Sequence, residues 1–99
     1  MPRTLDSTLR WSGVSDYVAV GAASAPSNAF GANTFEIRVV STTACHINIG
    51  QNPTAAATDS NGFYLPANVP EYFHVSPGQR LAVIQDAASG SLCIAEMTR

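Results

Sequence analysis

The sequence contains no lysine, and charged residues make up only 12% of its 99 positions. All five basic residues are arginines, and seven acidic residues leave a formal net charge of −2. A protein that binds nucleic acid through the phosphate backbone needs a basic patch or stripe. The composition therefore predicts that nucleic acid is not a partner.

Long hydrophobic runs are also missing. The longest apolar stretch, residues 18–23, is far shorter than the roughly 20 residues with which a helix crosses a bilayer. Residues 1–8 lack the apolar run of about 7 to 15 residues that a secretory signal contains. We therefore expect a protein that is made in a cytoplasm without a signal peptide and has no membrane partner.

Cysteine is scarce, with Cys45 and Cys93 as the two examples. Each lies inside a strand-like run, where a cysteine behaves as a small buried hydrophobe. A disulfide between them requires that the two strands are neighbours, and a reducing compartment disfavours it. We expect two free thiols.

Sequence motifs that are typical of a particular catalytic reaction are absent as well. His46 and His74 lack the ligand spacing of metal sites, including the paired His-x-His followed by Glu of cupin-type metal barrels. The sequence has neither the Gly-x-Ser-x-Gly of a nucleophile elbow nor a glycine-rich nucleotide loop. We predict no enzymatic activity, no cofactor and no metal. A small metalloenzyme barrel is an alternative only because two histidines are present.

The sequence does contain a series of short β-rich runs separated by turn residues. Turn signals recur at a spacing of about 8 to 12 residues, and no segment combines a helical period with capping residues. This pattern predicts an all-β fold, an antiparallel β-sandwich of seven to eight short strands that could be jelly-roll-like. Strand order cannot be read from these signals.

Alternation within the runs predicts which side chains face the core. In residues 34–40, Phe35, Ile37 and Val39 share the inner face, with Glu36 and Arg38 on the other. Residues 44–49 place His46 and Asn48 outward, and residues 80–85 are apolar on both faces, as in a central strand. Residues 76–79 predict a type II turn, and residues 86–90 a hairpin loop in a meander that forms the second half.

The beginning of the chain is interpreted as an arm. Residues 1–15 are rich in Ser and Thr, so we divide the chain into an N-terminal arm (1–15) and one sandwich domain (16–99). A solvent-facing Trp11 in a free tail would be an unusual use of the largest apolar side chain. Two interpretations stay open: the arm adds an edge strand to its own domain, or Trp11 anchors it to a neighbouring subunit.

Several aromatic residues are candidates for contacts between molecules. Phe63, Tyr64 and Leu65 are consecutive, so they cannot all point inward from one sheet. The candidate interface residues are Trp11, Phe63, Tyr64, Leu65 and Tyr72. A sugar-stacking platform of Trp11, Tyr17, Tyr64 and Tyr72 is the alternative use.

From Glu36 onward the chain resembles a group of small proteins encoded by tailed bacteriophages and prophages. The resemblance extends over about two thirds of the chain, and the matching segments within it are residues 37–50, 52–55, 64–67, 69–73, 75–78 and 82–86. In plan the group is similar to virion accessory proteins, small β-sandwiches that decorate or cement a capsid or lie at a tail junction. No catalytic residue is associated with the group.

The resemblance implies a non-enzymatic structural component of a tailed-phage virion, most simply a capsid decoration or cement protein. Its expected partners are the major capsid protein or other virion proteins and further copies of itself, with a trimer as the first guess from capsid symmetry. The alternative is a receptor- or carbohydrate-binding β-sandwich module of a tail or fibre. Few charges and spare aromatic residues fit both interpretations.

Overall fold

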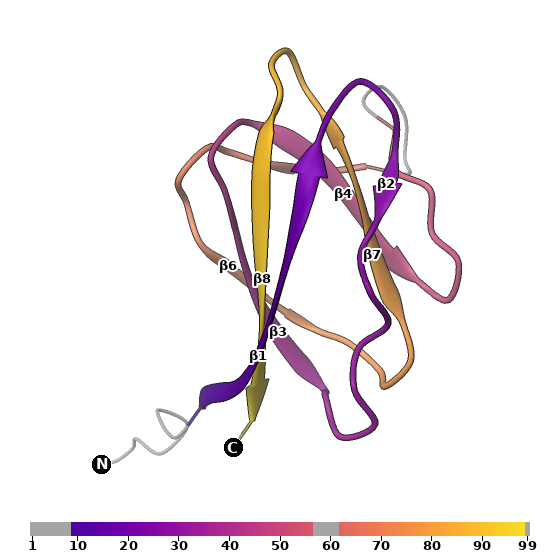
Figure 1. The fold of residues 1–99 in the computed structure, drawn as a ribbon, viewed down its shortest axis with the longest axis vertical. Coiled ribbons are helices and arrows are strands. Elements are labelled where there is room, and N and C mark those ends of the chain that lie inside the picture. The colour runs from indigo at the N-terminus through magenta and orange to yellow at the C-terminus, as the bar shows by residue number, and fades with distance from the viewer. Residues whose placement is uncertain (1–8, 57–61, 99) are drawn as a thin grey trace.

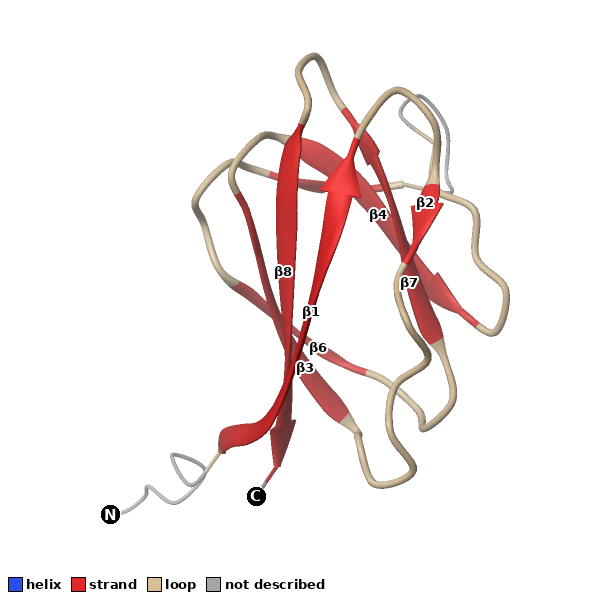
Figure 2. Cartoon of the chain, in the orientation of Figure 1, coloured by secondary structure: helices blue, strands red, loops and turns tan. Residues whose placement is uncertain are grey.

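The computed structural model describes residues 9–56 and 62–98 of the chain. These residues form two four-stranded antiparallel sheets and no helix (Figures 1 and 2). The strands are β1 (Arg10–Val20), β2 (Ala25–Pro26), β3 (Glu36–Ser41), β4 (Cys45–Gly50), β5 (Phe63–Leu65), β6 (Glu71–His74), β7 (Arg80–Gln85) and β8 (Gly90–Thr98). No helix of this described part is long and apolar enough to cross a membrane.

The strand order is that of an eight-stranded jelly roll. Sheet A has the order β1-β8-β3-β6 and sheet B the order β2-β7-β4-β5, and the two sheets face each other across one core (Figure 1). Strands β4 and β5 are the one pair of consecutive strands that share a sheet; every other connection crosses from one sheet to the other. The predicted antiparallel β-sandwich is confirmed.

The core is made by alternate side chains of the central strands. Ile37 and Val39 of β3 have no exposed surface and point inward, while Glu36 and Arg38 point outward as predicted. Strand β7 lies between β2 and β4, which confirms residues 80–85 as a central strand. The buried apolar cluster contains Val18, Val20, Phe30, Ile37, Val39, Cys45, Ile47, Leu65, Val75, Leu81, Val83, Leu92 and Ile94.

Two turn predictions have different outcomes. Gly78 has a φ of +83°, and the amide of Gln79 donates to the carbonyl of Ser76 at 3.1 Å, which agrees with the predicted turn. Residues 86–90, by contrast, do not close a hairpin, because β7 belongs to sheet B and β8 to sheet A. The predicted meander is therefore wrong: strands β5 to β8 alternate between the sheets.

Phe35 also differs from the prediction. Strand β3 begins at Glu36, so Phe35 precedes it, and the alternation of the strand does not govern its direction. Its side chain is 54% exposed instead of buried.

Strand β1 begins inside the segment that was assigned to an arm. Arg10 and Trp11 pair with Thr98 and Met97 of β8, so the boundary predicted at residue 15 falls within an edge strand of the domain itself. The register shifts between Trp11 and Ser15, where Gly13 adopts a φ of +98°. Residues 1–8, the rest of the predicted arm, lie outside the described residues.

A buried carboxylate secures the connection between β2 and β3. Glu96 of β8 is 8% exposed, and its Oε1 accepts hydrogen bonds from the amide of Gly31 at 3.1 Å and from the hydroxyl of Thr34. These bonds hold the loop of residues 27–35 against the end of the core.

Candidate interaction surface

The outer side of sheet A forms a broad surface that we call face A. Its members follow from the strand register, because side chains that point away from the core recur at every second position. They are Trp11, Ser15, Tyr17 and Ala19 of β1, Ser91, Cys93, Ala95 and Met97 of β8, Glu36, Arg38 and Val40 of β3, and Tyr72 and His74 of β6.

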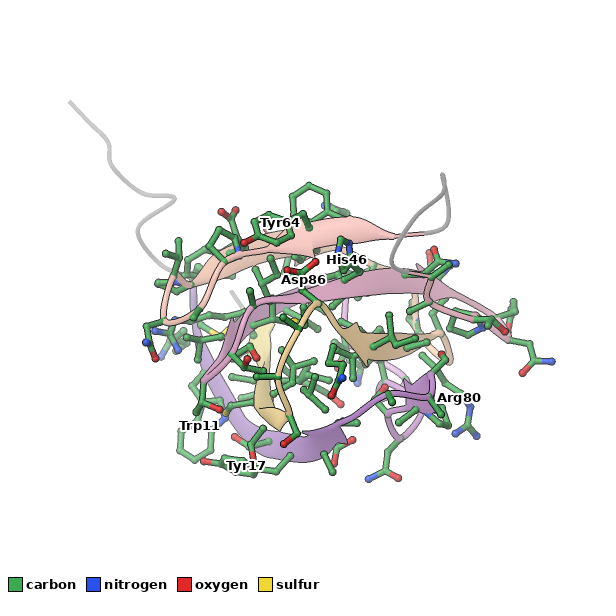
Figure 3. The ribbon with its side chains drawn as sticks, turned by 90° about the horizontal axis from the view of Figure 1, so that it is seen from above. Trp11, Tyr17, His46, Tyr64, Arg80 and Asp86 are labelled. Carbon is green, nitrogen blue, oxygen red and sulfur yellow. The ribbon has the colours of Figure 1, made fainter. Side chains whose placement is uncertain are left out.

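Large aromatic side chains stand on both edge strands of face A. Tyr17 is 73% exposed, Trp11 58% and Tyr72 55%, which are high values for such large apolar groups. Figure 3 shows Trp11 and Tyr17 on one side of the sandwich and Tyr64 on the opposite side. Three of the four aromatic residues considered for a sugar platform thus share one face, and Tyr64 does not.

Local hydrogen bonds hold Trp11 at the bulge of β1. Its indole Nε1 donates to the carbonyl of Val14 at 3.1 Å, and the amide of Val14 donates to the hydroxyl of Ser12 at 3.4 Å. The single polar atom of the indole is therefore satisfied within the strand. What the ring offers to a partner is apolar surface.

Charge is sparse on face A. Glu36 and Arg38, neighbours on the outer side of β3, are its two charged residues. Arg38 lies opposite Ala95 of β8 and Tyr72 of β6, and Glu36 lies opposite Met97 and His74. A face with one carboxylate and one guanidinium can be covered with little loss of charge hydration.

The two cysteines lie in different sheets, and both are free thiols. A hydrogen bond with the Cys93 thiol on face A raises the pKa of Tyr17 above its usual value. Cys45 faces the core, where burial raises the pKa of its thiol, although a hydrogen bond with Ser41 lowers it. Cys93 is the half-buried thiol of the pair.

The run of residues 63–65 divides among three environments. Leu65 points into the core and is fully buried, so its prediction as an interface residue is wrong. Phe63 packs edge-on against Phe73 of β6, with ring centroids 5.3 Å apart, and so joins β5 to β6 at one flank of the sandwich. Tyr64 lies on the outer side of sheet B and is half exposed.

His46 stands beside Tyr64 on the outer side of sheet B. Its Nε2 lies 2.9 Å from Oδ1 of Asp86, and its ring centroid is 5.4 Å from that of Tyr64 (Figure 3). His74 lies on face A, so the two histidines occupy opposite sides of the sandwich and cannot bind one ion together. Within the described part of the chain, no three His, Cys, Asp or Glu side chains form a group that could hold a metal ion.

Two of the hollows on the surface of the described residues lie beside exposed aromatic side chains. One of about 330 Å³ opens at the flank between the sheets and is lined by Ile47, Asn48, Ile49, Gly62, Phe63 and Phe73. The other, of about 290 Å³, lies at one end of face A and is lined by Asn33, Phe35, Glu36, His74, Met97 and Thr98. Exposed Phe35 thus extends the apolar surface of face A.

Comparisons with known proteins do not assign the chain to a family. No family model matches the chain, and no curated protein matches it. Among solved structures, the chain is similar to a cupin 2 conserved barrel domain protein from Salinispora arenicola, with 16% identity over 96% of this chain and 86% of that one. The TM-score is 0.46, and a likeness at this level does not assign the chain to the cupins.

The sequence identifies Trp11 and Tyr72 as candidate interface residues, but it does not show that they lie on the same surface. Alternation correctly placed Glu36 and Arg38 outside, and it left Tyr17 as one aromatic residue among several. Face A becomes visible only once β8 is known to lie between β1 and β3.

Proposed function

We propose that the protein is a non-enzymatic structural component of a tailed-phage virion, a capsid decoration or cement protein that works as a homo-oligomer. The observation that carries this proposal is face A, which presents exposed aromatic side chains with one acidic and one basic residue. Contiguous exposed apolar surface of this kind is typical of protein contacts. The resemblance of residues 36 onward to phage-encoded proteins supports the virion as the setting.

The fold suits such a role for mechanical reasons. Two sheets share one continuous core, and six of the seven connections cross between them, so the sheets cannot separate without breaking the core. A cement protein transmits load between the subunits that it joins, and a stiff sandwich with a broad outer face can do so. Jelly rolls also serve many other functions, so the fold supports the proposal without carrying it.

Analysis of purified virions of the phage that encodes the chain tests the proposal. Mass spectrometry should find the chain in a constant ratio to the major capsid protein. Electron cryo-microscopy should show a two-sheet density at each of its positions, lost in a gene-deletion phage and restored by complementation. Purified particles without the chain would overturn the proposal.

A carbohydrate-binding module of a tail or fibre is the second candidate function. It is favoured by Trp11, Tyr17 and Tyr72 on one face, because aromatic rings stack on sugar rings. Titration with host-surface polysaccharides should then quench the fluorescence of Trp11, and Tyr72→Ala should weaken the binding. Tyr64→Ala, on the opposite side, is the matched control. Equal effects of both substitutions would contradict this function.

A further inference from the structure

We propose that two copies of the chain associate face A to face A, around a two-fold axis that crosses β3 beside Ile37. The proposal deepens the homo-oligomer part of the proposed function and does not depend on the virion setting. It commits to a second copy of this chain as the occupant of face A.

Face A is the sheet surface that the described residues, 9–56 and 62–98, leave uncovered. On the outer side of sheet B, Ala82 has no exposed surface, although it points away from the core. There the segment after β4 folds back: Asn48 Nδ2 donates to the carbonyl of Thr54, and the amide of Ala55 donates to the hydroxyl of Ser24. On face A the aromatic side chains remain more than half exposed.

Strand addition at the edge of sheet A is a less suitable way to associate. At the bulge of β1, the amide and the carbonyl of Val14 are occupied by Ser12 and Trp11, and Gly13 leaves the extended conformation. Bulges of this kind protect an edge against pairing with another chain. The opposite edge strand, β6, has four residues. The face therefore offers the larger continuous surface.

The pattern of face A is complementary to itself. Two neighbouring rows of side chains cross all four strands of sheet A. The first row is Trp11, Met97, Glu36 and His74, and the second is Ser15, Ala95, Arg38 and Tyr72. Consider a two-fold axis that lies in the plane of the face, runs perpendicular to the strands and passes between the two rows. Rotation about this axis places the first row of one copy over the second row of the other copy.

This superposition matches each side chain of the two rows with a suitable partner. Glu36 of each copy meets Arg38 of the second copy, so the two charged groups of the face pair twice. The pairing adds to the contacts that Glu36 makes within its own chain, because a carboxylate accepts several hydrogen bonds.

The remaining members of the rows match by size and by type. Trp11 meets Ser15 of the second copy and Met97 meets Ala95, which sets large side chains against small ones. His74 meets Tyr72, which joins two aromatic rings. Aligned sheets in β-sandwiches pack with the same interdigitation.

A charge-exchange experiment tests the pairing. The probe is the protein itself, studied by sedimentation and native mass spectrometry at concentrations up to about 0.5 mM, where even weak dimers are populated. The wild type should form a dimer. Arg38→Glu places Glu36 against a second carboxylate and Glu36→Arg places two guanidinium groups together, so each variant should dimerise at least about tenfold more weakly.

Mixing the two variants in equal amounts should restore a heterodimer, because every contact between Glu and Arg is then present again. Arg80→Glu is the matched control: it makes the same charge change on the outer side of sheet B and should leave dimerisation unchanged. Circular dichroism of each variant should show that the sandwich is intact. Restoration in the mixture cannot come from misfolded chains.

Three outcomes would overturn the proposal: a monomeric wild type, a wild-type trimer, or a mixture that associates no better than either variant alone. None of these outcomes bears on whether the chain is present in virions, which the particle analysis decides. A face A dimer without a virion location would leave this inference standing and remove the proposed function.

Discussion

The imidazole Nε2 of His46 donates a hydrogen bond of 2.9 Å to Oδ1 of Asp86, which ties β4 to the connection between β7 and β8. The carboxylate is about half exposed, so solvent competes for it and the bond contributes about 1 kcal/mol or less. Asp86→Ala should lower the free energy of unfolding by that amount, measured by urea denaturation. His46→Ala should cost more, because it also removes the contact with Tyr64. Equal losses in the two variants would show that the ring contact contributes nothing.

Leu65 should be the most sensitive position of the run of residues 63–65. Leu65→Ala removes a fully buried side chain from the core and should cost about 2–5 kcal/mol of unfolding free energy. Tyr64→Ala, at a half-exposed position, should cost less than half as much. Thermal denaturation of the two variants measures the difference. If Tyr64→Ala were the more damaging change, the assignment of Leu65 to the core would be contradicted.

A side chain at Gly78 should strain the backbone, although space is available. Its φ of +83° is strained for any L-residue, so Gly78→Ala should destabilise the protein by about 1 kcal/mol. Gly21 has equally open surroundings without a positive φ, so Gly21→Ala is the matched control and should be neutral or slightly stabilising. Chemical denaturation of both variants separates backbone strain from steric contact. Equal stability of the two would refute the strain argument.

Glu96 should be needed for the loop that it holds. Glu96→Leu leaves the amide of Gly31 and the hydroxyl of Thr34 without their acceptor, which should cost about 1–3 kcal/mol of unfolding free energy. Glu96→Gln keeps one carbonyl oxygen at the same place and should cost less. Urea denaturation, with hydrogen exchange at the amide of Gly31, measures both effects. A Leu variant as stable as the wild type, with unchanged protection, would contradict this role.

Tyr17 should ionise at a higher pH than an ordinary tyrosine. Its hydrogen bond with Cys93 raises the phenol pKa, so the bond stabilises the fold below pH 10 and this stabilisation is lost as the pH rises through the higher pKa of the folded state. Ultraviolet titration of the tyrosines should show that the component due to Tyr17 moves to lower pH in Cys93→Ala. Cys45→Ala, at the buried thiol, is the control and should leave the component in place. An unchanged titration in Cys93→Ala would rule out the bond as the cause.

Local patterns in the sequence were sufficient to predict features that depend on a single strand or a single turn. Residues 80–85 are apolar on both faces, which favours a central strand over an edge strand, and β7 has the predicted bounds. Gly78 follows Pro77, and this pair determines the turn whatever the rest of the chain does.

The predictions were wrong for features that depend on which strands pair with one another. The turn residues of 86–90 are the same whether the chain returns to a neighbouring strand or crosses to the other sheet, so the hairpin was a reasonable but wrong expectation. Alternation could not show that β3 begins after Phe35. It also could not show that pairing with Cys45 turns Leu65 inward.

Face A could not be predicted either, because its composition depends on which strands are neighbours. Tyr17 and Tyr72 lie in strands that are distant in the sequence and come together only through β8 and β3. No local pattern contains that order. The candidate residues could therefore be named one at a time, while the surface that they form could not.

The position of β8 has a consequence for how the chain folds. Because β8, the last strand, lies between β1 and β3, sheet A cannot assemble until nearly all of the described chain has left the ribosome. Until then β1 has no partner strand, and its apolar residues Val18 and Val20 have no complete core to enter. Folding should therefore be slow and should be completed only after β8 has emerged, since most contacts join residues far apart in sequence. A nascent chain stalled before Gly90 should remain sensitive to protease along its whole length.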